Sequence, residues 1–321
     1  MKDSLNTLIN QLNKSSKFSL VAHPGPDGDS IGSIIALGLG LRFLGKTVSM
    51  YCTDTLPEQF KFIEETSLIS LGKPSDLDSC IIALDCSDEK RLTDQGVEIS
   101  AFTMSINIDH HPKNTCFADI NYCDDSKVAT AELIFEILKT LKVPITQPIA
   151  NTLYLGIVTD SGFFSYENTS SDTHAIASEL LESGVNPSVF KQNLEKKSIS
   201  HYKVLSYFLN NIKLYINNRV AVLVAEKNDL LVHGLSDFQQ IDDLVEYLRN
   251  IDGVEVAILI KCEPELLKFS FRSTSTLDVG EICRDFGGGG HKKAAGFSLK
   301  AQSHKKILAD VLKTVEGKLN E

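Results

Sequence analysis

The 321-residue sequence predicts an α/β protein with an N-terminal parallel-sheet domain, helices on both its faces, and a smaller C-terminal α/β or α+β domain. Three observations predict this class. Apolar runs alternate with helical segments from residue 17 to about residue 110, as in βαβ units. One run, Cys-Ile-Ile-Ala-Leu at 80–84, is continuously apolar, which is typical of a buried parallel strand. The length also favours two domains over one.

In the N-terminal half, strands are expected at 18–22, 47–52, 81–85 and 105–109, with a helix over 31–44 that Gly45 ends. Further helices are expected over 128–141, 149–159 and 172–183. Before the first strand, Leu5, Leu8, Ile9 and Leu12 follow helical spacing. This spacing predicts an amphipathic helix that packs on the domain.

The expected domain boundaries are 1–187 for the first domain, 188–212 for a helical connector and 213–321 for the second domain. The connector is polar and rich in Lys, Ser and Asn, with little apolar continuity. Beyond it, strands are expected at 212–216, 220–226, 254–262 and 266–271, and helices at 236–250, 278–286 and 303–318.

Composition limits the class of partner. The net charge of −10 argues against a protein that grips long duplexes, although a short anionic substrate met by metals remains compatible. Seven scattered cysteines without a C-x-x-C pattern favour buried thiols in a reducing compartment, the cytoplasm. Neither a signal-peptide core nor a membrane-spanning stretch is apparent, so no membrane partner is expected. The sequence gives no oligomeric state, and a homodimer is left open.

The stretch from Val21 to Ser33 is the first candidate site. His23, Asp27 and Asp29 lie there in a bed of Gly and Pro, between an expected strand and an expected helix. Such a stiff turn at the carboxyl end of a strand is where open α/β sheets place ligands. One imidazole and two carboxylates suit a divalent cation, although a loop with an N-cap explains the stretch equally well when it is taken alone.

Further acidic and imidazole side chains follow other expected elements. Asp85 ends one strand, Asp109-His110-His111 ends the next, and Asp160 follows a helix. Each by itself is more simply a cap, a turn or a surface residue. Jointly, the strand-end residues emerge at one sheet edge, where carboxylates repel one another unless cations neutralise them. The number of ligands is right for two divalent metal ions.

These motifs resemble those of the DHH phosphoesterase superfamily, named for the triplet found here at 109–111. The pattern His-x-x-Pro-Asp-x-Asp-x-x-Gly-Ser matches in full from His23 to Ser33. The second motif's Asp matches Asp85, and the fourth motif's Asp-Thr-Gly is found as Asp-Ser-Gly at 160–162, a mild departure. Together the four motifs span most of residues 18–165.

The resemblance implies a two-metal phosphoester hydrolase. Mixed imidazole and carboxylate donors favour Mn²⁺ over Ca²⁺, with Mg²⁺ and Co²⁺ as the alternatives. His23 and Asp27 would hold one ion, Asp29, His110 and Asp160 the other, and Asp85 both. A water shared by the ions would attack phosphorus. His111 would contact the phosphoryl group or the leaving group, and Asp109 would orient an imidazole. The implied catalytic residues are thus His111, Asp85 and Asp109.

The C-terminal half contains four consecutive glycines before a histidine. Alone, such a run is more simply a flexible loop, although bare N–H groups also admit an anion or a flat base. After four matched motifs, it resembles the DHH-associated C-terminal domain that binds the nucleotide part of the substrate. Arg272 offers a bidentate fork for phosphate. The implied substrate-binding residues, expected to face the metals across a cleft, are Arg272, Ser273, Gly287, Gly288, Gly289, Gly290 and His291.

Within the superfamily, the compact two-domain form resembles the bacterial nanoRNase A group. The resemblance implies hydrolysis of short oligoribonucleotides, linear dinucleotides such as pApA and 3′-phosphoadenosine 5′-phosphate (pAp).

No lysine/arginine motif of family II pyrophosphatases is found, and the chain has no room for the extra domain of RecJ-type exonucleases. A dedicated cyclic di-AMP phosphodiesterase and a non-catalytic nucleotide-binding module are the alternatives. Every ligand position is filled, which favours an enzyme. With no Trp and one compact anion patch, we expect slow turnover of long RNA.

Overall fold

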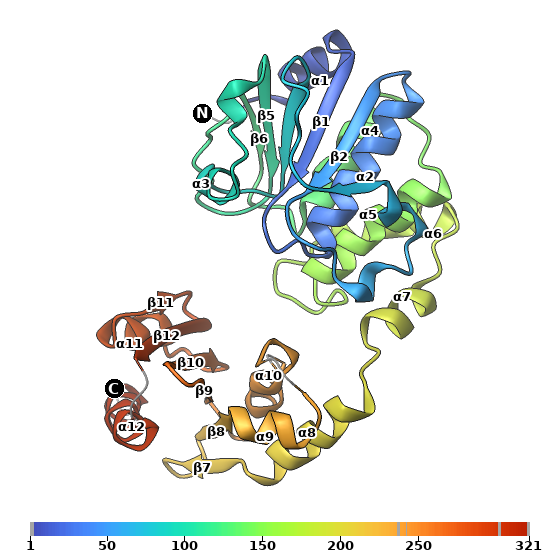
Figure 1. The fold of residues 1–321 in the computed structure, drawn as a ribbon. Coiled ribbons are helices and arrows are strands. Elements are labelled where there is room, and N and C mark those ends of the chain that lie inside the picture. The colour runs from blue at the N-terminus through green and yellow to red at the C-terminus, as the bar shows by residue number, and fades with distance from the viewer. Residues whose placement is uncertain (1–2, 236–237, 242, 301–302, 320–321) are drawn as a thin grey trace. The chain divides into compact units, whose positions relative to one another are not determined.

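The computed structural model describes residues 3–235, 238–241, 243–300 and 303–319. The chain divides into two compact units, Met1–Lys196 and Lys197–Glu321 (Figure 1). Among the described residues, no helix has both the length and the apolar character needed to cross a bilayer.

The N-terminal unit is built on a six-stranded sheet in which every pairing is parallel. Its order is β3-β2-β1-β4-β5-β6. The strands are β1 (Lys17–Ala22), β2 (Thr47–Cys52), β3 (Ile69–Leu71), β4 (Cys80–Leu84), β5 (Met104–Asp109) and β6 (Ile120–Cys123). The strand order reverses between β1 and β4, which is the switch point where sheets of this topology bind ligands.

Helices cover one face of this sheet around the larger core. They are α1 (Leu5–Lys14), α2 (Gly28–Phe43), α4 (Thr130–Thr140), α5 (Gln147–Asp160), α6 (Ser171–Glu182) and α7 (Pro187–Leu194). The other face packs a smaller cluster beneath α3 (Lys90–Thr93) and a 3₁₀ turn, Ile99–Ala101. The predicted strands, the main helices and the N-terminal amphipathic helix are confirmed, whereas β3 and β6 were not predicted.

The C-terminal unit contains a mixed sheet in the order β11-β12-β10-β9-β8-β7, in which only β8 and β9 pair in parallel. The strands are β7 (Lys213–Tyr215), β8 (Val220–Glu226), β9 (Val256–Cys262), β10 (Leu266–Ser273), β11 (Gly289–Gly290) and β12 (Ala294–Lys300). One core lies under α11 (Val279–Asp285) and α12 (His304–Leu319), and another under α8 (Ile199–Asn210), α9 (Lys227–Val232) and α10 (Leu244–Arg249).

One predicted helix differs from the structure. The helix expected over 236–250 is a 3₁₀ turn at Phe238–Ile241 followed by α10, and residues 236, 237 and 242 lie outside the described part. The expected helical connector 188–212 contains α7 and α8, each packed on its own unit. Phe190 of α7 is buried in the N-terminal core and Phe208 of α8 in the C-terminal one. These buried aromatic side chains anchor each helix, so the division between the units falls at 196/197.

Candidate metal centre

The first candidate ligands lie where β1 turns into α2. His23 follows the strand and is 4% exposed. Asp27 is the N-cap of α2, and its Oδ1 accepts a hydrogen bond from the Ser30 backbone N–H at 3.0 Å. Asp29, in the first helical turn, is completely buried. The cap therefore fixes where α2 begins and places one carboxylate at the surface and one in the interior.

The next strand ends supply two more buried carboxylates. Asp85 follows β4 with a left-handed backbone, φ 59°, which Asp tolerates better than most residues. Its Oδ1 accepts a hydrogen bond from the Thr130 hydroxyl at 3.0 Å. Asp109 ends β5 and is also fully buried. The parallel sheet thus brings the predicted strand-end residues to one edge.

His110 lies among three carboxylates. Its Nε2 is 3.3 Å from Asp160 Oδ2, 3.6 Å from Asp85 Oδ1 and 3.9 Å from Asp29 Oδ2. Its Nδ1 lies 3.3 Å from the Lys127 carbonyl oxygen. Asp160 is the last residue of α5, so that helix delivers its carboxylate to the histidine.

His23 has a similar arrangement on the other side of Asp85. Its Nε2 is 3.3 Å from Asp85 Oδ2 and 3.6 Å from Asp27 Oδ2. Its Nδ1 lies 2.8 Å from the Pro24 carbonyl oxygen. A metal-binding histidine usually donates its second ring N–H to a carbonyl or carboxylate, which leaves the other nitrogen free for the ion.

Among the residues that the structure describes, three groups of side chains are close enough to hold an ion, with ligand atoms within 4.8 Å of one another. They are His23 with Asp27 and Asp85, Asp29 with His110 and Asp160, and Asp85 with His110 and His111. All six predicted ligands belong to them. Asp85 occurs in two groups, which is where a bridging carboxylate would lie.

The electrostatics of this centre show an excess of negative charge. Burial lowers the pKa of His23, but the neighbouring carboxylates of Asp27 and Asp85 outweigh it and raise this pKa to about 10. Burial likewise lowers the pKa of His110, but Asp160, Asp29 and Asp85 raise it to about 10. Burial and the charges of Asp85 and Asp160 raise the pKa of Asp29 well above its usual range. Without cations, protons must therefore compensate the crowded carboxylates.

Two buried atoms at the centre lack hydrogen bonds. Neither Asp85 Oδ2 nor His110 Nε2 has a hydrogen-bond partner among the residues that the structure describes. Leaving such atoms unsatisfied in the interior is costly. A carboxylate oxygen and an imidazole nitrogen are both donors for a divalent transition metal. The residues at this centre therefore fit metal ions.

Asp109 and His111 form a separate pair beside the centre. His111 Nδ1 donates to Asp109 Oδ1 at 2.8 Å, and Asn114 donates to Asp109 Oδ2 at 2.6 Å. The hydrogen bond to Asp109 is the main reason why the pKa of His111 is raised. The predicted role of Asp109, orienting an imidazole, is consistent with this geometry. Sequence reasoning missed Asn114, which carries no motif of its own.

Sequence reasoning also missed Thr130 and Arg91. Thr130 begins α4 and donates its backbone N–H to Asp29 Oδ2 at 2.6 Å as well as its hydroxyl to Asp85. The helix N-terminus therefore supports a buried carboxylate. Arg91 of α3 approaches His23, with Nη2 2.9 Å from Nδ1. The sequence signals that could have pointed to them are the position of Arg91, six residues after Asp85, and the position of Thr130 at the start of a helix.

Close helix packing holds these ligands in place. A Cβ at Gly32 of α2 would lie 2.2 Å from the Thr152 carbonyl oxygen of α5, and one at Gly156 would lie 2.6 Å from Asp29 Oδ1. The two helices can approach this closely only because both positions lack a side chain. The motif glycine thus positions Asp29 against α5, which ends at Asp160.

The predicted substrate-binding residues gather on one edge of the C-terminal sheet. Arg272 of β10 pairs with Ala294 of β12, and Ala294 exchanges backbone hydrogen bonds with His291. Arg272 is already engaged, because its Nε donates to Glu246 Oε1 at 2.8 Å. Ser273 is 4% exposed and its hydroxyl lies 3.3 Å from the Ser275 carbonyl oxygen, so this side chain packs within the unit.

The four glycines form an ordered element. Gly287 ends α11 with φ 79°, and Gly289 and Gly290 form β11 against β12. A Cβ at Gly288 would lie 2.2 Å from the Gly296 carbonyl oxygen. The flexible-loop explanation of the glycine run does not hold, because the glycines permit close strand packing.

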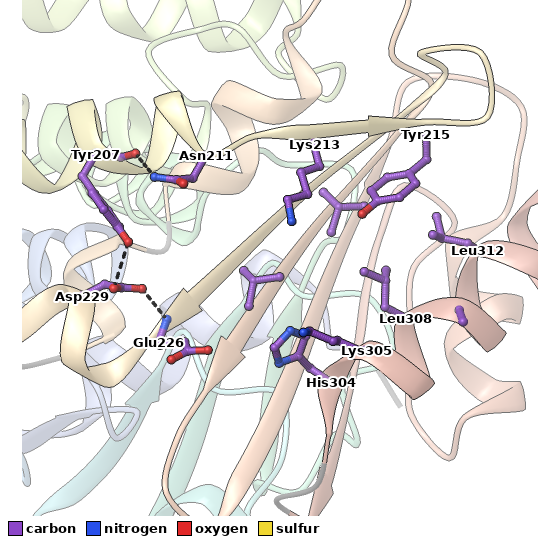
Figure 2. Close-up of a pocket in the computed structure, with 13 residues that line it drawn as sticks. Tyr207, Asn211, Lys213, Tyr215, Glu226, Asp229, His304, Lys305, Leu308 and Leu312 are labelled. Carbon is purple, nitrogen blue, oxygen red and sulfur yellow. Dashed lines mark hydrogen bonds between the residues drawn. The ribbon is translucent and has the colours of Figure 1, made fainter.

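A cavity of about 640 Å³ lies elsewhere in the C-terminal unit. Figure 2 shows Lys213 and His304 on opposite sides of it. The Tyr207 hydroxyl donates a hydrogen bond to Asp229 Oδ1, with 3.0 Å between the two oxygen atoms. Its lining residues come from α8, β7, β8, α9 and α12 and include none of the predicted substrate-binding residues. The anchor predicted from sequence and this cavity are therefore different places.

Comparisons with known proteins place the chain in a family. Residues 17–157 match the DHH family, N-terminal domain, and residues 217–320 match the DHHA1 domain. A Thermus thermophilus protein described as the bifunctional oligoribonuclease and PAP phosphatase NrnA is 30% identical over 305 residues. These cover 94% of this chain and 89% of that protein. The chain therefore belongs to the DHH family of phosphoesterases.

Two solved structures share its fold. An exopolyphosphatase-related protein from Bacteroides fragilis is 24% identical with a TM-score of 0.88, over 99% of this chain and 97% of that one. RecJ from Thermus thermophilus in complex with Mn²⁺ is 14% identical with a TM-score of 0.58, over 98% of this chain and 54% of that one. At these identities the likeness establishes the fold alone.

Proposed function

We propose that this protein hydrolyses short oligoribonucleotides and linear dinucleotides to mononucleotides, and pAp to AMP. The observation that carries the proposal is the meeting of His23, Asp27, Asp29, Asp85, His110 and Asp160 at the switch point of the parallel sheet. The similarity to the Thermus thermophilus protein described as an oligoribonuclease and PAP phosphatase supports the choice of substrates.

Two divalent ions, with Mn²⁺ favoured, would be held at this centre. His23 and Asp27 would ligate one ion, Asp29, His110 and Asp160 the other, and Asp85 both. In support, Asp85 shares one group with His23 and Asp27 and another with His110. Mixed imidazole and carboxylate donors suit Mn²⁺, and the RecJ structure that shares this fold contains Mn²⁺. When bound, such ions supply Lewis-acid activation of water and neutralise phosphoryl charge.

The chain's own residues prepare the centre in three ways. The Lys127 carbonyl oxygen near His110 Nδ1 favours the tautomer that leaves Nε2 of His110 as a metal ligand, and the Pro24 carbonyl oxygen and Arg91 Nη2, 2.8 and 2.9 Å from His23 Nδ1, orient the His23 ring. The start of α4 and Thr130 hold Asp29 and Asp85 in fixed orientations. His111, held by Asp109 and about one-third exposed, is available to contact the phosphoryl or leaving group.

The nucleotide part of the substrate would contact the edge of the C-terminal sheet. Arg272 supplies a guanidinium, the glycine run 287–290 offers backbone without side chains, and His291 is an exposed imidazole nearby. Because Ser273 is buried, we assign it a supporting role within β10, next to Arg272 in the strand. Among the described residues no disulfide links the cysteines, which supports a cytoplasmic location.

The decisive experiment compares substrates side by side in Mn²⁺. We expect pApA, other two- to five-nucleotide RNAs and pAp to be hydrolysed quickly, and pyrophosphate and an unstructured RNA of about 25 nucleotides slowly, since the latter needs an extended binding groove. Faster cleavage of cyclic di-AMP than of pApA would instead support a cyclic dinucleotide phosphodiesterase. Binding of these nucleotides without hydrolysis would indicate a non-catalytic module.

A matched pair of variants links the activity to the centre. Asp85→Asn removes the shared carboxylate with almost no change in size, and we expect it to abolish hydrolysis of every substrate. Asp88→Asn alters an exposed carboxylate three positions away, and we expect activity like that of the unaltered protein. Full activity of the unaltered protein in excess EDTA would refute a metal-dependent reaction.

A further inference from the structure

The loop that follows Asp160 has an unusual backbone. Gly162, Phe163 and Phe164 all have left-handed conformations, with φ of 54°, 55° and 63°. Bulky residues rarely adopt this conformation, and such strain persists only where surrounding contacts enforce it. Here Ser161 enforces it, because its hydroxyl accepts from the Phe164 N–H at 2.9 Å and its carbonyl accepts from Tyr166 at 3.1 Å.

The left-handed turn sends the aromatic side chains in different directions. Phe163 and Phe164 pack against the core of the N-terminal unit, and Phe164 stacks on His174 with ring centroids 5.2 Å apart. Tyr166 is instead 56% exposed. Its ring lies against the backbone of Gly162, where an added Cβ would lie 2.5 Å from ring atoms Cε1 and Cζ. The ring is therefore supported from below and open to solvent.

This exposed ring lies close to the metal centre. Gly162 is two residues after Asp160, so their Cα atoms are at most about 7.6 Å apart. Asp160 Oδ2 is itself 3.3 Å from His110 Nε2. A nucleotide whose phosphate is at the centre has a base within reach of this loop. An exposed aromatic ring on a rigid support is a surface on which bases stack regardless of sequence.

We propose that Tyr166 is a stacking platform for a nucleobase of the substrate and thereby selects nucleotides over other phosphoesters. This inference rests on the proposed function, since it concerns the substrate of the same centre. Base stacking stabilises the bound substrate and the transition state equally, so its loss raises KM and leaves kcat largely unchanged. The phenol hydroxyl is not required, because the ring face makes the contact.

Kinetics with and without the base provide the first test. We expect Tyr166→Ala to raise the KM for pAp about tenfold or more, as loss of one base–aromatic stack does. The KM for the same ribose bisphosphate lacking adenine should not change, and Tyr166→Phe should retain the KM of the unaltered protein. An equal effect on both substrates would overturn the inference. Failure of the unaltered protein to hydrolyse pAp would instead contradict the proposed function.

A binding measurement provides a test independent of turnover. The chain contains no Trp, so Tyr166→Trp introduces a single tryptophan fluorophore at the platform. AMP should quench its fluorescence in Mn²⁺, and ribose 5-phosphate should not. Phe43→Trp is the control, because Phe43 is 61% exposed at the far end of the 16-residue helix α2, about 24 Å from its start. Quenching at both positions, or at neither, would overturn the stacking role.

Discussion

His110 and Asp85 face each other across the centre of the N-terminal site. His110 Nε2 lies 3.6 Å from Asp85 Oδ1, and neither that nitrogen nor Asp85 Oδ2 has a hydrogen-bond partner among the described residues. Both atoms are buried, so their arrangement costs stability unless something other than a protein group satisfies them. This relationship explains why stability and activity should respond oppositely to loss of a carboxylate.

Asp160→Asn separates these two effects. Burial and the charge of Asp85 raise the pKa of Asp160, so the charged form of this carboxylate lowers the stability of the folded protein. In EDTA we expect the variant to have a Tm equal to or above that of the unaltered protein. In Mn²⁺ the unaltered protein should gain stability, about 2.7 kcal/mol at 100 times the Kd, and the variant should gain much less. A lower Tm of the variant in EDTA, with the Mn²⁺ gain retained, would contradict the proposed ligand.

His111 and Asp109 should behave as one unit. His111→Ala should retain bound metal, measured after gel filtration, and lower kcat about 100-fold, the loss typical of a positioned catalytic donor. Asp109→Asn should lower kcat less, because it acts by orienting His111 over 2.8 Å. The double variant should be no slower than His111→Ala alone. Additive losses would show that Asp109 acts independently of His111.

Arg272 and Arg249 offer a matched comparison in the C-terminal unit, since both contact Glu246, at 2.8 Å and 2.9 Å. Arg272→Ala should raise the KM for pApA about 10- to 100-fold, as loss of a hydrogen bond to a charged group does. Its KM for a small generic phosphodiester should change little. Arg249→Ala should affect neither substrate strongly. If both variants raise the KM for pApA equally, the effect arises from Glu246 and not from an anchor at Arg272.

Two glycines of α2 test the packing that holds Asp29. Gly32→Ala places a Cβ 2.2 Å from a backbone carbonyl oxygen and should destabilise the protein by about 1–3 kcal/mol, measured by urea unfolding. Gly38→Ala places its Cβ 2.6 Å from the flexible Met50 side chain, which can move. It should cost little, because a helical Gly→Ala change is itself favourable by up to about 1 kcal/mol. Equal stability of the two variants would contradict the proposal that Gly32 allows α2 to pack closely against α5.

The sequence alone determined much of the N-terminal unit. Continuous apolar runs and Gly or Pro punctuation are local signals, so they located β1, β2, β4 and β5 and the helices between them. The same local signals placed Asp85 and Asp109 at strand ends. In a parallel sheet, side chains at neighbouring strand ends lie close together. Turns and strand ends can be recognised within a few residues, so these side chains were candidates before any coordinates, and the choice of the six proposed ligands rested on the resemblance to the DHH superfamily.

Other features depended on contacts between distant residues. Thr130 supports Asp29 across 101 positions, and Glu246 engages Arg272 across 26, with no motif marking either pair. The glycine run is a strand because β12 packs against it, and Tyr166 is exposed because a strained turn directs it away from the core. Only tertiary structure decided these features, since side-chain partners and burial follow from how whole elements pack and not from the local pattern that forms each one.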